Sequence, residues 1–304
     1  MELKLSKLLT FVAFTFLTSN IAANNGLAPE VTDLNAEDIS FQKEKEIPYL
    51  EKPFISTSPK AMNDQLKVGK LGIDGGKEEL VLKYVRELAK KSEDPKSGKT
   101  DSLLIAYKNK LLFESYFRRG RRNYPHYQMS ITKSYTAYAI GRAIQLGHLS
   151  MDDLHKPVVW FLKEIKPEQL AKGTEKITLN QAMQMRSGIR LPKKKIGEII
   201  QRPSILLGQG QARAYLQFSQ DLPDLPDSSL QTNPSTFYGY FWWRQTLDIE
   251  DRKYDSIQGR GAGGQFIFII PTLELVISAT AHNQGMGKMR AQLPHYLIPA
   301  FSKN

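Results

Sequence analysis

Apolar side chains recur every three or four residues between positions 128 and 147, where they occupy Tyr135, Tyr138, Ala139, Ala143 and Leu146. This spacing predicts a helix with one buried stripe. Gly147 directly follows the last apolar position and suits the left-handed conformation that ends many helices. Residues 77–91 have the same spacing, at positions 81, 84, 85 and 88, and predict a second amphipathic helix.

Shorter apolar runs near both ends of the chain predict strands. Residues 103–107 and 111–117 form one expected hairpin, and residues 265–270 and 273–279 form another around Pro271 and Thr272. The aromatic run at 238–243 is interpreted as a single strand. Strands at both ends with helices between them predict an α+β fold, with one antiparallel sheet built from both chain ends and the helix after the first hairpin packed on its face.

Three more helices are predicted in the second half of the chain. They cover residues 177–187, with Thr178 as the N-cap, residues 212–218, and residues 294–301. The remainder of 189–236 is expected to form loops, because five prolines interrupt it.

The N-terminus has the pattern of a cleavable secretory signal. Lys4 and Lys7 precede an apolar run at 8–17, and small residues follow up to Ala23. The apolar run is too short to span a bilayer, so we expect cleavage near Ala23 and a periplasmic or secreted protein. Residues 1–23 are therefore interpreted as the signal, residues 24–76 as an extended N-terminal arm, and residues 77–304 as one catalytic domain.

The composition excludes several classes of site. The 304 residues contain no cysteine, which excludes thiolate zinc sites, iron–sulfur clusters, disulfides and a cysteine nucleophile. The histidines show no metal-binding spacing; they are His126, His148, His155, His282 and His295. Each is interpreted as a surface or capping residue, so the sequence predicts neither a metal site nor a cofactor.

The net charge of +11 is concentrated in basic runs at 118–122 and 193–195, both in expected loops. Such runs usually form solvated surface. Export argues against a nucleic-acid partner, and weak association with an anionic membrane surface is the expectation that fits the charge better. The sequence leaves the oligomeric state open.

Ser130 and Lys133 lie one helical turn apart at the start of the helix predicted over 128–147. A serine hydroxyl needs a nearby base to act as a nucleophile, and a half-buried lysine with a lowered pKa can be that base. The start of the helix also offers backbone N–H groups to an oxyanion. The other Ser-x-x-Lys match, Ser40 to Lys43, lies in an acid-rich stretch without a preceding strand and is discarded.

Four segments in order carry a family resemblance. They are Met-Ser-Ile-Thr-Lys-Ser at 129–134, Leu-Asn-Gln-Ala-Met-Gln-Met-Arg-Ser-Gly-Ile at 179–189, Tyr-Gly-Tyr-Phe-Trp-Trp at 238–243 and Gly-Ala-Gly-Gly-Gln-Phe at 261–266. With these segments, the chain resembles the serine hydrolase superfamily of class C β-lactamases, penicillin-binding proteins and esterases, and most of all its 6-aminohexanoate-dimer hydrolase branch.

The resemblance implies a three-layer α/β/α fold of the β-lactamase/transpeptidase type, here with a reduced helical subdomain. It also implies that Ser130 is the acylated nucleophile and that Lys133 is its proton partner. Residues 259–261 would be the third motif, and the backbone N–H groups of Ser130 and Ala262 would form the oxyanion hole. The implied substrate is a small molecule with an amide or ester bond.

The sequence departs from the family in one respect. The family's second motif is a tyrosine followed two residues later by Asn or Ser, and no such pair occurs in 189–237. Tyr215 is a weak candidate to replace it. The passage between about Leu222 and Thr236 is also short, which suggests either a deletion or a shortened member with impaired acyl transfer.

Three hypotheses follow for the function. The first is an exported serine hydrolase that forms an acyl-enzyme on Ser130. The lack of lysine in the third motif then favours esters or small linear amides over carboxylate-bearing β-lactams. The second is a catalytically impaired protein of the same fold that binds or acts as a scaffold in the envelope. The third, from charge alone, is a protein that binds polyanions. The sequence does not identify the substrate.

Overall fold

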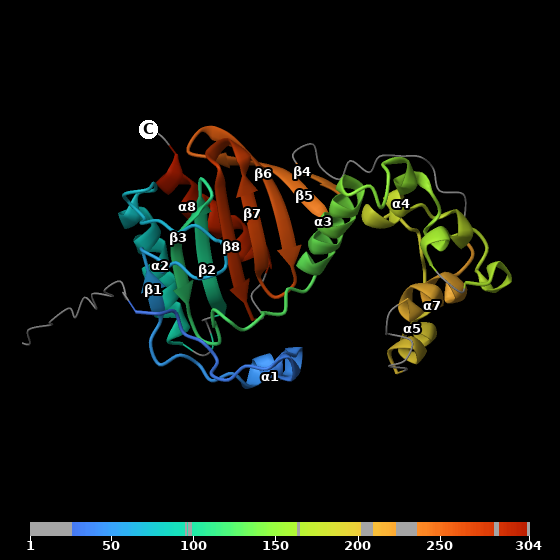
Figure 1. The fold of residues 1–304 in the computed structure, drawn as a ribbon, viewed down its shortest axis with the longest axis horizontal. Helices are drawn as coiled ribbons and strands as arrows, with labels where there is room; N and C mark the ends of the chain where they lie inside the picture. Colours follow the sequence, from blue (N-terminus) through green and yellow to red (C-terminus); the bar gives the residue numbers. More distant parts are fainter. Residues whose placement is uncertain are drawn as a thin grey trace, which may run out of the picture.

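The computed structural model describes residues 26–94, 96, 99–162, 165–201, 209–222, 236–282 and 286–302. An eight-stranded antiparallel sheet dominates it, with strand order β1-β3-β2-β8-β7-β6-β5-β4 (Figure 1). The predicted signal, residues 1–23, and the passage at 223–235 lie outside the described residues. No helix within the described ranges is long and apolar enough to cross a membrane.

The strands have the following bounds: β1 Phe54–Ser56, β2 Thr100–Tyr107, β3 Lys110–Tyr116, β4 Thr236–Gly239, β5 Trp242–Ile249, β6 Arg252–Gly261, β7 Gln265–Ile270 and β8 Leu275–Ala281. Inside the sheet β2 pairs with β8, in a register that sets Ile105 opposite Ile277. This pair joins the two ends of the chain. The predicted α+β fold, with one sheet built from both chain ends, is thereby confirmed.

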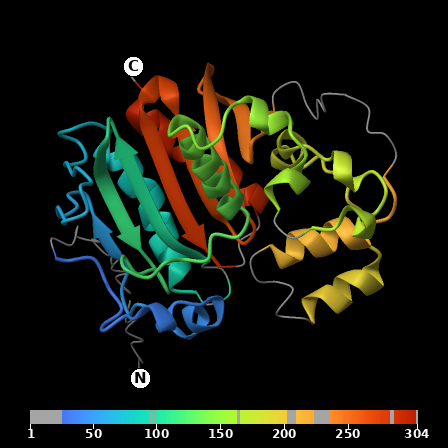
Figure 2. The same ribbon diagram turned by 45° about the vertical axis from the view of Figure 1, so that its right-hand side comes forward.

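One face of the sheet is covered by α2 (Glu78–Ser92) and α8 (Met286–Phe301) (Figures 1 and 2). The two helices pack side by side, and the rings of Tyr84 and Tyr296 stack with centroids 5.0 Å apart. The main hydrophobic core lies between these helices and the strands. Its largest fully buried members include Phe113, Phe266 and Phe268.

The other face of the sheet carries α3 (Ile131–Gln145), which lies in front of β6 and β7 in Figure 2. Beyond it is the helical part of the molecule (Figure 1). Its elements are η2 Asp152–His155, η3 Val158–Phe161, η4 Pro167–Gln169, η5 Thr174–Lys176, α4 Leu179–Met183, α5 Lys193–Ile200 and α7 Gly210–Phe218. The sheet therefore lies between two helical layers.

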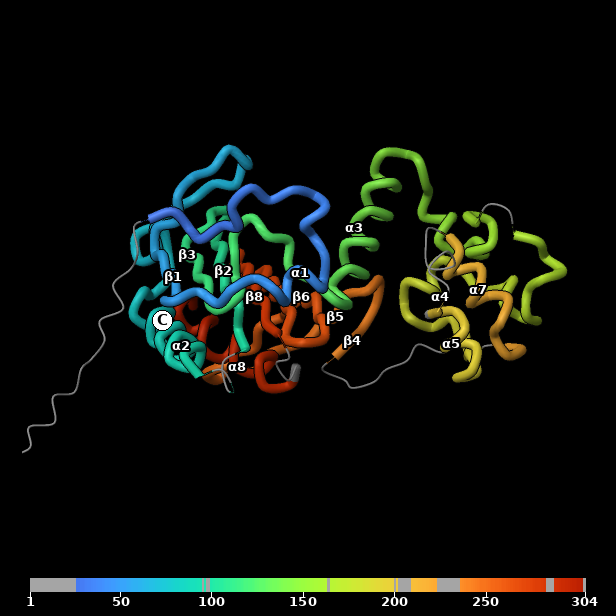
Figure 3. Tube along the Cα trace, turned by 90° about the horizontal axis from the view of Figure 1, so that it is seen from below, coloured from blue at the N-terminus to red at the C-terminus, as the bar shows by residue number. Residues whose placement is uncertain are grey.

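The N-terminal arm, from residue 26, runs along the domain and includes η1 (Ala36–Asp38), α1 (Phe41–Glu46) and β1 (Figure 3). The sequence predicted an extended arm, and within it β1 pairs with β3. The arginines at 118–122 also contact the arm and are not a free solvated run. Arg118 is buried, donates to the Tyr49 hydroxyl at 2.6 Å and lies over the Tyr49 ring, while Arg121 donates to the Pro48 carbonyl at 2.9 Å.

The aromatic run at 238–243 is a hairpin, so the prediction of one strand was wrong. Tyr240 and Phe241 both have positive φ angles, of 50° and 64°, and form the two-residue turn between β4 and β5. That backbone twist matches the twist of the strands but is unusual for aromatic residues. Two hydrogen bonds hold the turn, one from the Ser134 hydroxyl and one to the Met183 carbonyl.

Three expectations about helices need correction. The stripe predicted on α3 is exposed, with Tyr135 at 53% and Tyr138 at 77%, because the helix packs through Ile131 and the small Ser134. The helix expected over 177–187 ends at Met183, although Thr178 is its N-cap as predicted. Lysines 193–195 lie in α5 and not in a loop, and the buried Ile199 anchors this helix. The helices predicted at 77–91, 212–218 and 294–301 are confirmed, the last beginning earlier.

Candidate active site

Ser130 and Lys133 face one another on the first turn of α3. Lys133 Nζ lies 3.0 Å from Ser130 Oγ. Ser130 is exposed and Lys133 is half-buried, so a substrate can reach the hydroxyl from solvent. The serine is the N-cap of α3, but its hydroxyl makes no capping hydrogen bond. The oxygen is thus available to the lysine, in contrast to Ser40, whose hydroxyl caps α1 by accepting from Lys43 N–H.

The backbone before the serine is strained. Met129 has a φ of 51°, in the left-handed region that non-glycine residues rarely adopt. Its carbonyl oxygen accepts hydrogen bonds from the N–H and the hydroxyl of Thr132, at 3.2 and 2.7 Å. These bonds start the helix directly after the strained residue, and Ser130 at this point is exposed. Strain of this kind concentrates at functional sites.

The glycine-rich end of β6 lies against the start of α3. A Cβ atom on Gly261 would be 2.5 Å from the Gln128 carbonyl oxygen, and one on Gly259 would be 3.5 Å from Ser134 Oγ. Ala262 follows in the exposed turn. Among the described residues, neither the Ser130 N–H nor the Ala262 N–H has a hydrogen-bond partner. Both amides are therefore free to donate to an oxyanion, and their role there stays a prediction.

Arg260 does not supply a cation to this site. Successive side chains on a strand point to opposite faces, so Arg260 points away from the α3 side that Gly259 faces. Its guanidinium donates to Gln258 and Gln245 at 2.8 and 2.7 Å and lies over the Trp243 ring. Burial, and then the charge of Arg290, lowers the pKa of Arg260 to about 10. On the α3 side the third motif offers backbone only.

The β4–β5 turn connects the predicted motifs. The Ser134 hydroxyl donates to the Phe241 carbonyl at 2.9 Å, and the Phe241 N–H donates to the Met183 carbonyl at 3.0 Å. The Ser-x-x-Lys helix, the end of α4 and the aromatic hairpin thus meet at one residue. These segments belong to one family pattern in the sequence, but that pattern does not predict the contact between them.

The structure does not place Tyr215 beside the serine. Tyr215 lies on α7, and its hydroxyl accepts from the Gln211 side chain of the same helix at 3.3 Å. In Figure 1, α7 lies in the helical part, away from the start of α3. The hypothesis of a deletion between Leu222 and Thr236 concerns residues outside the described ranges and stays a hypothesis.

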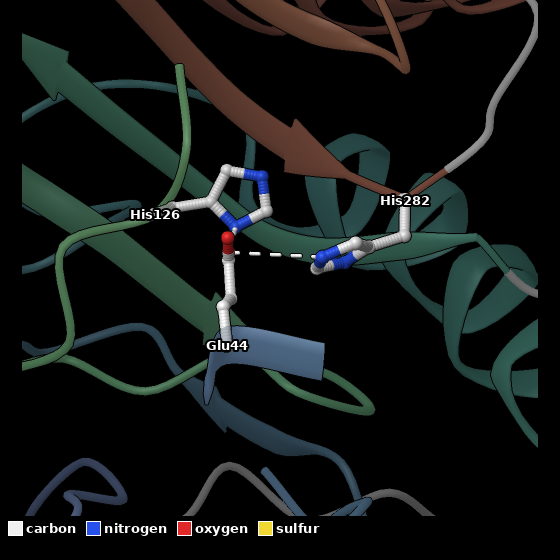
Figure 4. A group of neighbouring side chains, drawn as sticks. All are labelled: Glu44, His126 and His282. Atoms are coloured by element: carbon white, nitrogen blue, oxygen red, sulfur yellow. Dashed lines mark ion pairs between the residues drawn. The ribbon is translucent and has the colours of Figure 1, made fainter. Parts of the chain in front are cut away.

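Two histidines were wrongly expected at the surface. The side chains of His126 and His282 are only 14% and 17% exposed, and each contacts a carboxylate. They converge with Glu44 (Figure 4). The three residues are far apart in the sequence, so no local spacing could reveal the group. His148, His155 and His295 are exposed as expected.

A Ser-x-x-Lys pair at the start of a helix is an arrangement that β-lactamases and penicillin-binding proteins share. The comparisons agree. Residues 89–201 match the family model described as Beta-lactamase. This match covers just over a third of the chain and includes Ser130 and Lys133, and it bears out the resemblance predicted from the sequence.

One solved structure supports the fold. The chain is similar to the "Putative 6-aminohexanoate-dimer hydrolase from Bacillus anthracis", with a TM-score of 0.51, 14% identity, and coverage of 88% of this chain and 95% of that one. It is also similar to the "putative beta-lactamase from Bacteroides dorei DSM 17855", with a TM-score of 0.42, 15% identity, and coverage of 74% and 97%. Of these two similarities, only the first is used as support here, and it shows the fold alone. No curated protein matches the sequence.

Proposed function

We propose that the chain is an exported serine hydrolase that cleaves an ester or a small linear amide through an acyl-enzyme on Ser130. The observation that carries the proposal is the distance of 3.0 Å between Lys133 Nζ and Ser130 Oγ. A base at hydrogen-bond distance is what a serine hydroxyl needs to become a nucleophile. The match to the Beta-lactamase family model supports the proposal that the substrate is a small molecule and the reaction is hydrolysis.

In the proposed mechanism Lys133 acts as the general base. Its amine takes the Ser130 hydroxyl proton while Oγ attacks the substrate carbonyl carbon. The N–H groups of Ser130 and Ala262 donate to the resulting oxyanion. The intermediate collapses to an acyl-serine, and Lys133 returns the proton to the leaving alcohol or amine. Water then attacks the ester, which releases the acid and regenerates the serine.

The substrate preference follows from the surroundings of the serine. The third motif contributes backbone on the α3 side, because Gly259 has no side chain and Arg260 points to the other face. A substrate held through a carboxylate would need a cation at that position. The open site therefore favours an uncharged acyl group, such as that of a simple ester.

A fluorophosphonate probe tests the acyl-enzyme directly. We expect the folded chain to gain one probe mass, and the Ser130→Ala variant to gain none. Lys133→Ala should slow labelling by about 10²–10⁴-fold, the usual contribution of a general base. Ser40→Ala is the matched control, because it changes a serine of the discarded motif and should label normally.

The outcome that contradicts the proposal is a folded wild-type chain that resists both the probe and a panel of esters. That result would favour the non-catalytic binding protein on the same fold. Export is tested separately by the N-terminal sequence of protein recovered from outside the cytoplasm. We expect it to begin near residue 24, and recovery of an uncleaved cytoplasmic chain would overturn export.

A further inference from the structure

Three side chains with metal-binding chemistry converge between the N-terminal arm and the sheet (Figure 4). Glu44 projects from α1, His126 from the loop that leads to Ser130, and His282 from the residue after β8. Their ligand atoms all lie within 4.8 Å of one another. Oε1 of Glu44 lies 2.5 Å from Nδ1 of His126 and 3.7 Å from Nε2 of His282.

The glutamate is buried and incompletely satisfied. Its side chain is 3% exposed, and Oε2 accepts from the Tyr127 N–H at 3.2 Å. Oε1 is buried and makes no hydrogen bond of acceptable geometry within the described part of the chain. Figure 4 shows this carboxylate directed at the two imidazole rings. A buried carboxylate oxygen needs a positively charged or hydrogen-bonding neighbour, and a cation between the two rings and the carboxylate would supply one.

Asp101 orients one of the two rings. Its side chain is 1% exposed, and Oδ2 lies 2.5 Å from Nδ1 of His282, while Oδ1 accepts from the Arg119 N–H at 3.1 Å. A carboxylate at Nδ1 holds the proton on that nitrogen and leaves the lone pair of Nε2 directed at Glu44. This carboxylate–imidazole pair is the usual support of a metal-binding histidine.

From these contacts we infer that Glu44, His126 and His282 bind a divalent transition-metal ion, with zinc the ion that best suits two imidazoles and one carboxylate. Zinc takes such ligands at about 2.0–2.2 Å and is most often four-coordinate. The Glu44 Oε1 to His126 Nδ1 separation would widen by somewhat less than 1 Å when both atoms coordinate one ion. The fourth position would hold water.

The ion would fix the arm to the loop that precedes the nucleophile. Glu44 belongs to the arm, and His126 lies four residues before Ser130. The site stands apart from the hydrolytic proposal, because neither Ser130 nor Lys133 contributes to it.

Metal content and thermal stability test the site. We expect the purified chain, stripped with a chelator, to bind one equivalent of Zn²⁺ by calorimetry and to gain in melting temperature. His126→Gln and His282→Gln should each lose the binding, whereas His148→Gln and His295→Gln, at exposed histidines, should keep it. Asp101→Asn keeps all three ligands and should weaken affinity about 10–100-fold. Cobalt substituted for zinc should give the visible spectrum of a tetrahedral site.

The rival arrangement is a shared proton, in which His126 and Glu44 form an ion pair without a metal. In that case Zn²⁺, Co²⁺ and Mn²⁺ would leave the melting temperature of the wild-type chain unchanged. Equal binding by wild type and by both ligand variants would likewise overturn the site, since it would assign the metal to surface histidines. If the ligand variants do not fold, the Zn²⁺ affinity of Asp101→Asn tests the site instead. An affinity equal to that of wild type would contradict the proposal.

Discussion

The hydroxyl of Ser134 donates a hydrogen bond of 2.9 Å to the main-chain carbonyl of Phe241. This bond joins the helix that carries Ser130 and Lys133 to the turn between β4 and β5. The same turn is joined to α4 through the Phe241 N–H and the Met183 carbonyl, 3.0 Å apart. The position of the candidate nucleophile therefore depends on a turn that follows it by about a hundred residues.

Ser134→Ala should weaken this connection. The change leaves the Phe241 carbonyl without its side-chain donor, and we expect a loss of about 0.5–1.5 kcal/mol in the free energy of unfolding. Labelling of Ser130 by the fluorophosphonate should also slow, because the first turn of α3 loses the hydrogen bond that holds it to the β4–β5 turn. Thr136→Ala removes a hydroxyl that bonds only within the exposed side of α3, at 3.1 Å to the Thr132 carbonyl, and serves as the control. Equal effects of the two changes would contradict the proposed link.

Gly261→Ala should disturb the oxyanion side of the candidate site. The added Cβ would lie 2.5 Å from the Gln128 carbonyl oxygen and 2.8 Å from Gln265 Cβ, so the loop before Ser130 or the strand end must shift. We expect a cost of about 1–3 kcal/mol in the free energy of unfolding and a larger proportional loss of labelling rate.

The matched control for Gly261 is Gly141→Ala. Gly141 lies within α3 with nothing inside 4 Å of its added Cβ, so alanine there should stabilise the helix by about 0.5–1 kcal/mol. Urea unfolding measures both variants. If the Gly261→Ala protein were labelled at the wild-type rate, the end of β6 would not be part of the candidate oxyanion hole.

Local signals account for what the sequence predicted well. Ser130 and Lys133 are three residues apart on a helix, so helical geometry alone brings them together. The hairpin of β7 and β8 follows from two apolar runs around Pro271, and the N-cap role of Thr178 follows from its position before an apolar helix. These elements need no knowledge of distant contacts.

The features that the sequence did not predict depend on contacts between segments far apart in the chain. The turn at Tyr240 and Phe241 has neither Gly nor Asn, and hydrogen bonds to α3 and α4 help to hold its backbone there. The tyrosines of α3 remain exposed because the approach of Phe241 and Gly259 selects the Ser134 side of the helix. The group of Glu44, His126 and His282 has no periodic signature.

Tyr215→Phe tests the weak candidate for the missing tyrosine. Because the Tyr215 hydroxyl bonds to Gln211 within α7, we expect the labelling rate of Ser130 to stay within about twofold of wild type. A loss on the scale of about 10²-fold, as expected for a group that shuttles the proton of the serine, would mean that α7 approaches the site during catalysis. Gln211→Ala is the control for any loss of helix stability.

The buried carboxyl of Glu114 predicts a pH-dependent stability. Glu114 is 5% exposed on β3 and accepts from the Tyr116 hydroxyl at 3.2 Å; burial raises its pKa above the usual value. A raised folded-state pKa contributes stability that is present below the unfolded pKa and is lost as pH rises through the folded value. Glu114→Gln should therefore match wild type at about pH 4 but exceed it at pH 8, by about 1–3 kcal/mol, the range for incompletely satisfied buried polar groups. Urea unfolding at several pH values measures the difference, with the exposed Glu87→Gln as control. A gain that does not grow with pH would show that Glu114 is ionised at no cost in the folded chain.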